Sequence, residues 1–352
     1  MSSPPRACFD RPSQDGTPRP RRRDFLRGLA RSGLFLAGVA PMTGCDSRPS
    51  AKTARVGFLA TGSREGRGFL VDSFAGGLRE LGYIEGENIE IEYRFSDAQD
   101  ERLPALAAEL VERKVDVIVA SGTPATFAAK RATSTIPIVM PASAADPVAT
   151  GLVASFANPG GNITGLSALT AGLAGKRLEM LRGILPNLER VSVFWNPTSP
   201  TYGPVLVELK AVAPALGVQI QLVEVRVPDD FPRAFDEATR GRAEAMLVPG
   251  DPLTTNRPAR VAELALQARL PTMMEFRQFV LAGGLLSYGV NLVDLYRRAA
   301  GYVDKILKGA HPANLPLQEP ELFDFAINLT TAQALGLAIP DPILARATEV
   351  IP

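Results

Sequence analysis

Short apolar segments and longer amphipathic segments alternate along the chain from about residue 55 to its end. The short segments are rich in Val, Ile, Leu and Phe, which is typical of buried β-strands. The longer ones repeat apolar residues at helical spacing, as Leu103, Leu106 and Leu110 do. The predicted strands are Arg55–Ala60, Asn88–Arg94, Val115–Ala120, Ile136–Met140, Arg190–Trp195, Val218–Val225, Ala245–Val248, Pro271–Met274, Gly284–Tyr288 and Phe323–Asn328. This pattern predicts an α/β fold with parallel sheets covered by helices on both faces.

The alternation pauses at a turn-rich cluster, Asn158–Asn162, which divides the strands into two sets. A length of 352 residues also fits two domains. Irregular segments late in the sequence would let the chain return to the first set of strands and then cross again to the second. We therefore predict two doubly wound, Rossmann-like lobes joined by a three-segment hinge. The predicted lobe 1 comprises residues 54–162 and about 289–318, and lobe 2 comprises 163–288 and about 319–352.

The amino-terminal residues carry a different pattern, which we interpret as an export signal within residues 1–44. Residues 1–20 are rich in Pro, Ser and Arg and predict a disordered extension. The arginines at 21–23, followed by Phe25 and Leu26, resemble the twin-arginine (Tat) export signal. The small and apolar run 32–44 is too short to span a membrane.

Cys45 ends the segment Met42–Cys45, which resembles a bacterial lipobox. We predict that Cys45 is acylated and that the polar residues 45–53 form a lipidated tether to the membrane. The alternative is a plain cleaved signal followed by a chance cysteine. Cys8 would leave with the signal, so we expect no internal disulfide.

Composition excludes several classes of function. The chain has one His and two Cys, too few for most zinc sites, haem attachment or Cys/His catalysis, so metalloenzymes and cysteine proteases are excluded. For the protein as a whole we predict no metal, no cofactor and no enzymatic activity. Eight of the 38 basic residues precede Cys45, and the remainder has 30 basic and 34 acidic residues. An acidic remainder without a basic stripe argues against a nucleic-acid partner.

Small polar residues follow three strands of the first lobe. In open α/β sheets ligands bind beyond the carboxyl ends of the strands, where the amide groups of helix N-termini attract anions. Ordinary helix capping is the alternative, because the same residue types are preferred there. The candidate ligand-binding residues of this lobe are Thr61, Gly62, Ser63, Ser121, Gly122, Thr123, Ser143 and Asp146.

In the second lobe the corresponding candidates are Asn196, Asp251, Glu275 and Tyr288. Asp251 follows a strand end, from which its carboxylate could pair with a ligand ammonium group. The alternative for Asp251 is a simple turn with Pro252, and for Tyr288 it is hinge packing instead of stacking on the ligand. Trp195 ends an apolar strand and fits core packing better than the wall of a cleft.

Several segments together resemble the bacterial ABC-transporter substrate-binding proteins that include tryptophan- and tyrosine-type binders. They are Leu78–Tyr93, Val115–Pro124, Ile136–Met140, Asp146–Pro147, Asn158–Gly165, Val193–Pro197, Ala282–Gly289, Asp294–Ala300 and Val303–Gly309. The resemblance implies a class I periplasmic-binding-protein fold that holds a small ligand between its lobes.

The resemblance implies an extracytoplasmic solute receptor, periplasmic or at the cell surface, of an ABC importer. We expect a monomer that binds a small polar or zwitterionic molecule, for which an aromatic amino acid is a family-level expectation, and that delivers it to ABC permease subunits. The alternative is a ligand sensor that passes its closed state to a signalling partner. A hydrolase is disfavoured because the chain has no Gly-x-Ser-x-Gly elbow.

Overall fold

The computed structural model describes residues 53–97, 99–169, 171–199 and 202–352. All of them belong to one compact unit, Ser50–Pro352, in which the described residues form four hydrophobic clusters. The predicted signal, Cys45 and most of the tether lie outside the described residues. Within the described part, no helix is both long enough and apolar enough to cross a membrane.

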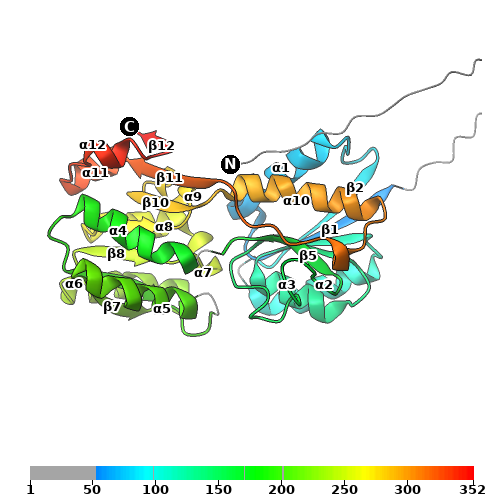
Figure 1. Ribbon diagram of the computed structural model, residues 1–352, viewed down its shortest axis with the longest axis horizontal. Coiled ribbons are helices and arrows are strands. Elements are labelled where there is room, and N and C mark those ends of the chain that lie inside the picture. Colours follow the sequence, from blue (N-terminus) through cyan, green and yellow to red (C-terminus); the bar gives the residue numbers. More distant parts are fainter. Residues whose placement is uncertain (1–52, 98, 170, 200–201) are drawn as a thin grey trace, which may run out of the picture. The chain divides into compact units, whose positions relative to one another are not determined.

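The first sheet has five parallel strands in the order β2-β1-β3-β4-β5. Successive strand residues bury against opposite faces, since Val117 and Val119 join one core and Ile118 the other. Figure 1 shows α1 and α10 side by side on one face, and α2 and α3 pack on the other. The elements of this lobe are β1 (Ala54–Ala60), α1 (Arg64–Glu80), β2 (Ile89–Phe95), α2 (Leu103–Glu112), β3 (Val117–Ser121), α3 (Thr123–Ala132), β4 (Ile138–Ser143), β5 (Ile163–Ser167) and α10 (Leu292–Leu307).

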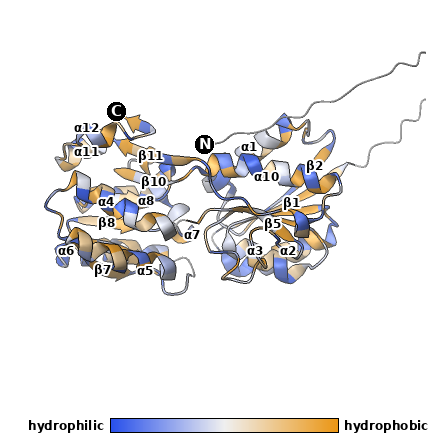
Figure 2. Ribbon diagram, viewed as in Figure 1, coloured by the Kyte–Doolittle hydropathy of each residue, from blue (hydrophilic) through white to orange (hydrophobic). Residues whose placement is uncertain are grey.

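The second sheet has seven strands in the order β12-β11-β10-β9-β8-β6-β7, and β10 and β11 run antiparallel. Its strands are β6 (Arg190–Trp195), β7 (Gln219–Glu224), β8 (Ala245–Val248), β9 (Thr272–Met274), β10 (Leu286–Val290), β11 (Phe323–Asn328) and β12 (Glu349–Ile351). Its helices are α4 (Ala174–Ile184), α5 (Tyr202–Val212), α6 (Phe231–Arg240), α7 (Pro252–Thr255), α8 (Pro258–Gln267), α9 (Arg277–Leu281), α11 (Leu329–Leu335) and α12 (Asp341–Leu344). Apolar residues run through the strands, while the helices also carry hydrophilic ones (Figure 2).

Short 3-10 turns complete the described elements, at Asp100–Arg102, Ala171–Leu173, Ala213–Leu216, Pro228–Asp230 and Pro312–Asn314. Every strand predicted from the sequence is present, with ends that differ by three residues or fewer. The short strands β5 and β12 are additional.

The first lobe extends further than the predicted boundary at residue 162. Strand β5 pairs with β4, so the chain changes sheet only after Ser167. The turn-rich cluster at 158–162 is therefore a connection inside the first lobe. A strand this close to the turn escaped the sequence pattern because it contains Gly165, whose φ is +132° and which lies tightly against the Met140 backbone.

Among the described residues, the chain crosses between the two sheets at three places. It leaves β5 for α4, leaves β10 for α10, and returns through residues 318–322 to β11. Helix α10 belongs to the first lobe because Leu295, Tyr296 and Ala299 are buried in its core. The crossing segments are hydrogen-bonded to one another, with the Ser167 amide 2.9 Å from the Gln318 carbonyl and the Asn291 amide 2.9 Å from that of Leu322.

Candidate functional site

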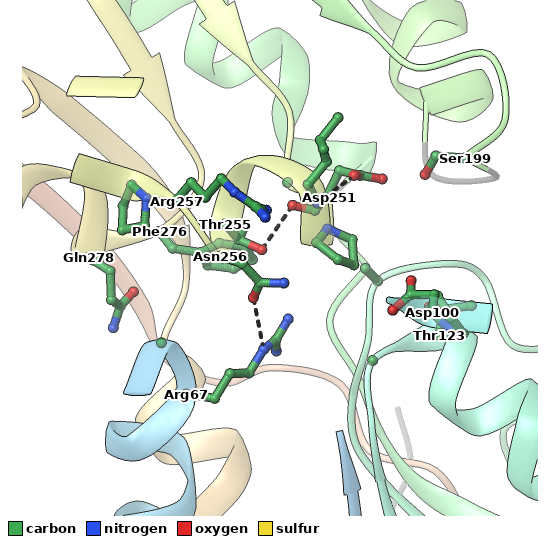
Figure 3. Close-up of a pocket in the computed structure, with 18 of the residues that line it drawn as sticks. Arg67, Asp100, Thr123, Ser199, Asp251, Thr255, Asn256, Arg257, Phe276 and Gln278 are labelled. Atoms are coloured by element: carbon green, nitrogen blue, oxygen red, sulfur yellow. Dashed lines mark hydrogen bonds between the residues drawn. The ribbon is translucent and has the colours of Figure 1, made fainter. Parts of the chain in front are cut away.

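A cavity of about 440 Å³ lies between the two lobes at the carboxyl ends of their strands. The turns after β3, β6, β8 and β9 supply Gly122, Asn196, Asp251 and Phe276 to its wall. Figure 3 shows side chains from both lobes facing this space, including Thr123 and Asp100 from the first and Asp251 and Arg257 from the second. Parallel strands that end at one edge explain why residues far apart in sequence converge here.

On the first lobe, Gly122 and Thr123 form an anion-attracting corner. Gly122 has φ of +100° and a Cβ there would lie 2.8 Å from Oγ1 of Thr61, so only glycine fits. Helix α3 begins at Thr123 without a side-chain cap, and the amide groups of its first turn have no partner within the helix. The Thr123 hydroxyl is buried and has no hydrogen-bond partner among the described residues.

On the second lobe, Asp251 presents a buried carboxylate. It is 6% exposed and begins α7, with Oδ1 accepting the Leu253 amide at 2.8 Å. Burial raises the pKa of Asp251, hydrogen bonds from Ser199 and Leu253 lower it, and the charges of Asp100 and Glu275 raise it. In the part of the chain that the structure describes, no Lys or Arg forms an ion pair with this carboxylate. A partly desolvated carboxylate without an ion pair is suited to a cationic ligand group.

Asn196 also lines the cavity, as its place after β6 predicted. Its Oδ1 accepts hydrogen bonds from the amide and the hydroxyl of Thr198, at 3.1 and 2.7 Å. These bonds fix the orientation of the Asn196 side-chain amide at the cavity wall.

The turn Thr61–Ser63 does not line the cavity. The Thr61 hydroxyl accepts a hydrogen bond from Arg67 at 3.1 Å, and Ser63 caps α1 by accepting the Gly66 amide at 3.2 Å. Gly62 lies against Asn256 of the second lobe. Ser63 therefore acts as a helix cap, which was the alternative to ligand binding.

Three further candidates of the first lobe also lie outside the cavity lining. The hydroxyl of Ser121 is hydrogen-bonded to that of Tyr296, whose side chain takes its place at the wall. Ser143 donates to the Ala145 carbonyl at 2.9 Å, and Asp146 accepts the amides of Val148 and Ala149. Ser143 and Asp146 bond to nearby backbone groups and Ser121 bonds to the distant Tyr296, so these polar groups already have partners outside the cavity.

Glu275 and Tyr288 lie behind the cavity wall. The Glu275 carboxylate pairs with Arg177 at 2.9 Å and is 1% exposed, while Nε of Arg177 donates to the Tyr288 carbonyl at 2.7 Å. The Tyr288 ring stacks on Phe323 and meets Phe325 edge-on, which is the hinge-packing alternative. Trp195 packs edge-on against Tyr202 and does not line the cavity either.

Several lining residues carry no motif in the sequence. They are the apolar Phe69, Leu70, Phe276, Phe279 and Leu292 and the charged Arg67, Asp100, Glu101, Arg226 and Arg257. The charged set, taken with Asp251, holds three cations and three anions, which suits a zwitterion better than a strongly charged ligand. Phe276 follows the candidate residue Glu275. Because successive side chains of an extended segment point to opposite sides, this alternation could have identified Phe276 as the lining residue. The described residues contain no group of His, Cys, Asp and Glu that could hold a metal ion.

Two α/β lobes with a cavity between them define the class I periplasmic-binding-protein fold, which confirms the fold predicted from the sequence. The chain belongs to the ABC transporter substrate binding protein family, whose model matches residues 56–351. The resemblance seen in the sequence is thereby confirmed. Members of this family bind solutes and are not enzymes, as predicted.

Individual relatives agree with this assignment. The "Tyrosine-binding protein" of Clostridioides difficile (strain R20291) is 26% identical over 313 residues, which cover 85% of this chain and 89% of that protein. A conserved domain protein from Vibrio cholerae is similar in structure, with a TM-score of 0.80, 29% identity and coverage of 85% and 100%. A Streptococcus pneumoniae ABC domain in complex with L-Trp has a TM-score of 0.78, 25% identity and the same coverage. Substrate-binding proteins of ABC importers act outside the cytoplasm, in line with the predicted export.

Proposed function

We propose that this protein is a lipid-anchored, extracytoplasmic receptor that binds a zwitterionic amino acid with an aromatic side chain and delivers it to an ABC permease. One observation carries the proposal: the buried Asp251 carboxylate, which has no ion pair among the described residues, and an uncapped helix N-terminus line the same cavity from opposite lobes. These two features complement the ammonium and carboxylate groups that every free amino acid carries.

The ligand carboxylate binds at the start of α3. The amides of the first helical turn and the positive end of the helix dipole attract an anion. The buried Thr123 hydroxyl, which has no partner among the described residues, donates to the same group. Leaving such a hydroxyl unsatisfied costs about 1–3 kcal/mol, and a bound carboxylate removes that cost.

The ligand ammonium binds at Asp251. This carboxylate already accepts hydrogen bonds from the Leu253 amide and from Ser199, and its two oxygens retain lone pairs for a further donor. A desolvated ammonium–carboxylate pair is worth more than an exposed pair. Because the two ligand ends bind to different lobes, one molecule ties the lobes together.

The ligand side chain packs against the apolar part of the wall. Phe69, Phe276 and Tyr296 line the cavity together with Leu70 and Leu292. A ring offered to such a surface gains apolar burial and favourable aromatic contacts. The names of two relatives, one tyrosine-binding and one solved with L-Trp, point to the same class of ligand.

Anchoring rests on the sequence of the amino terminus. An acylated Cys45 and a short polar tether would keep the domain beside its permease, since two acyl chains hold a protein on a membrane stably. The two lobes of the compact unit Ser50–Pro352 each have their own cores, which fits a monomeric receptor.

A thermal-shift and calorimetry series on residues 50–352 tests the proposal. L-Tyrosine and L-tryptophan at ~100 times their Kd are expected to add ~2.7 kcal/mol to stability. Tyramine, which lacks the carboxylate, and 3-(4-hydroxyphenyl)propionate, which lacks the ammonium, serve as matched controls and should bind far more weakly. Equal binding of tyramine and L-tyrosine would contradict the carboxylate site, and no stabilisation by any of the common amino acids would refute the proposal.

A further inference from the structure

Arg67 joins the two lobes directly at the wall of the cavity. Its Nε donates to Oδ1 of Asn256 on the second lobe at 3.2 Å (Figure 3), and its Nη2 donates to the Thr61 hydroxyl on the first lobe at 3.1 Å. Both Arg67 and Asn256 are half-buried and line the cavity. Arg67 forms no ion pair within the described residues, so its two oriented donors go to neutral acceptors.

The first lobe is shaped to receive Asn256. A Cβ at Gly62 would lie 2.7 Å from Oδ1 of Asn256, so the side-chain amide lies against a position where only glycine leaves room. The Gly62 turn is held in place within its own lobe, because its amide donates to the Ser96 hydroxyl at 3.1 Å and its carbonyl accepts the Asp97 amide at 2.8 Å. The contact thus combines a hydrogen bond with a close steric fit.

Asn256 is also connected to the ligand site through a single helical turn. Asp251 caps the start of helix α7. Its backbone carbonyl accepts hydrogen bonds from both the amide and the hydroxyl of Thr255, at 2.8 and 2.9 Å. Asn256 ends the same turn, with its amide 3.2 Å from the Pro252 carbonyl. A movement of Asp251 toward a ligand therefore moves Asn256 relative to Arg67.

We propose that Arg67 and Asn256 form a latch that holds the lobes together in the ligand-free protein, and that α7 couples this latch to the ligand-binding carboxylate of Asp251. The latch itself follows from the contacts, whereas its coupling to ligand rests on the proposed function. Arg67 and Asn256 are positioning residues: they set how far the lobes open, and so how fast a bound molecule leaves.

Solution scattering of ligand-free residues 50–352 tests the latch. Arg67→Ala and Asn256→Ala are each expected to increase the radius of gyration, and the double variant should open no further than either single one, because each substitution removes the same bond. Asn256→Asp offers Arg67 an ion pair and should keep the wild-type radius. Arg260→Ala is the matched control, since Arg260 is exposed, pairs with Glu263 on α8 and is not among the residues that line the cavity.

Melting temperatures within a few degrees of the wild type show that the variants fold. An unchanged radius in both alanine variants overturns the latch, whatever the ligand. Binding kinetics with L-tyrosine then test the coupling: the alanine variants should raise Kd about tenfold, mainly through faster dissociation, as expected for one lost hydrogen bond to a charged group. If L-tyrosine and L-tryptophan fail to bind the wild type, the proposed function fails and the scattering still decides the latch. If L-tyrosine binds and its dissociation rate is the same in all variants, the coupling is wrong.

Discussion

The guanidinium of Arg177 lies 2.9 Å from the carboxylate of Glu275, and both side chains are fully buried beneath the cavity wall. Burial lowers the pKa of Arg177 and the charge of Glu275 raises it. Gly250, at the wall, has no room for a Cβ because Oε2 of Glu275 would lie 2.1 Å from it. The ion pair thus sits directly behind the turn that carries Asp251 and links α4 to the β10 hinge strand through the Tyr288 carbonyl.

Removing one member of this pair should destabilise the fold strongly. Glu275→Gln leaves Arg177 as an uncompensated buried charge, which is expected to cost ~3–5 kcal/mol in urea unfolding. Glu263→Gln breaks an exposed pair with Arg260 and should change stability by ~1 kcal/mol or less. A Glu275→Gln variant as stable as the Glu263→Gln control would show that the buried pair does not hold the hinge strand in place.

Asp251→Asn should separate binding from folding. Asparagine keeps the shape and still caps α7, so the unfolding free energy should change little. The loss of charge should weaken L-tyrosine binding by ~2–5 kcal/mol in calorimetric titration. The same Kd for wild type and variant would reject Asp251 as the ammonium partner, and Asn196 would then be the next candidate.

Binding should weaken in acid because burial raises the pKa of Asp251 above its ordinary value of 3.8. A carboxyl group whose pKa is raised on folding destabilises the ligand-free fold while the group is charged. This destabilisation disappears as the pH falls through the raised pKa. The ligand ammonium pairs only with the charged form of Asp251, so the Kd for the ligand should rise as the pH falls through the raised pKa of Asp251. Titrations from about pH 8 to about pH 4.5 measure this rise. The rise should be absent in Asp251→Asn, and an identical pH profile in that variant would assign it to another group.

Ligand binding should bring the lobes closer together. The three crossing segments form a hinge, and a ligand tied to Asp251 and Thr123 draws its two sides inward. Saturation with L-tyrosine should lower the radius of gyration of the Arg67→Ala variant, which starts more open, by more than that of the wild type. Superimposable scattering curves with and without saturating ligand in both proteins would contradict hinge closure.

Cys45→Ala should release the protein from membranes. If Cys45 carries the lipid, the full-length variant is expected in the soluble fraction, because the apolar run before it is too short to hold the chain. Fractionation and metabolic labelling with a fatty acid measure both consequences. Retention of the unlabelled variant in the membrane fraction would contradict the lipobox interpretation.

The sequence alone determined the fold class and much of its layout. Strands such as Arg190–Trp195 and Ala245–Val248 are in place to the residue, because a buried parallel strand must be a short, nearly continuous apolar run. It also located Gly122, Thr123, Asn196 and Asp251 at the cavity, since the residue after a strand lies at the binding edge whatever the rest of the chain does. Their roles toward a ligand stay a prediction.

Only the tertiary structure decided which polar groups are free to meet a ligand. Ser121 and Glu275 lie at strand ends, as Thr123 and Asp251 do. Their polar groups are nevertheless bound by Tyr296 and Arg177, which come from distant parts of the chain. The Arg67–Asn256 contact joins residues 189 positions apart. Local sequence carries periodicity and strand ends because those depend on neighbouring residues. The partner of a side chain depends on how helices and lobes pack, which no local pattern encodes.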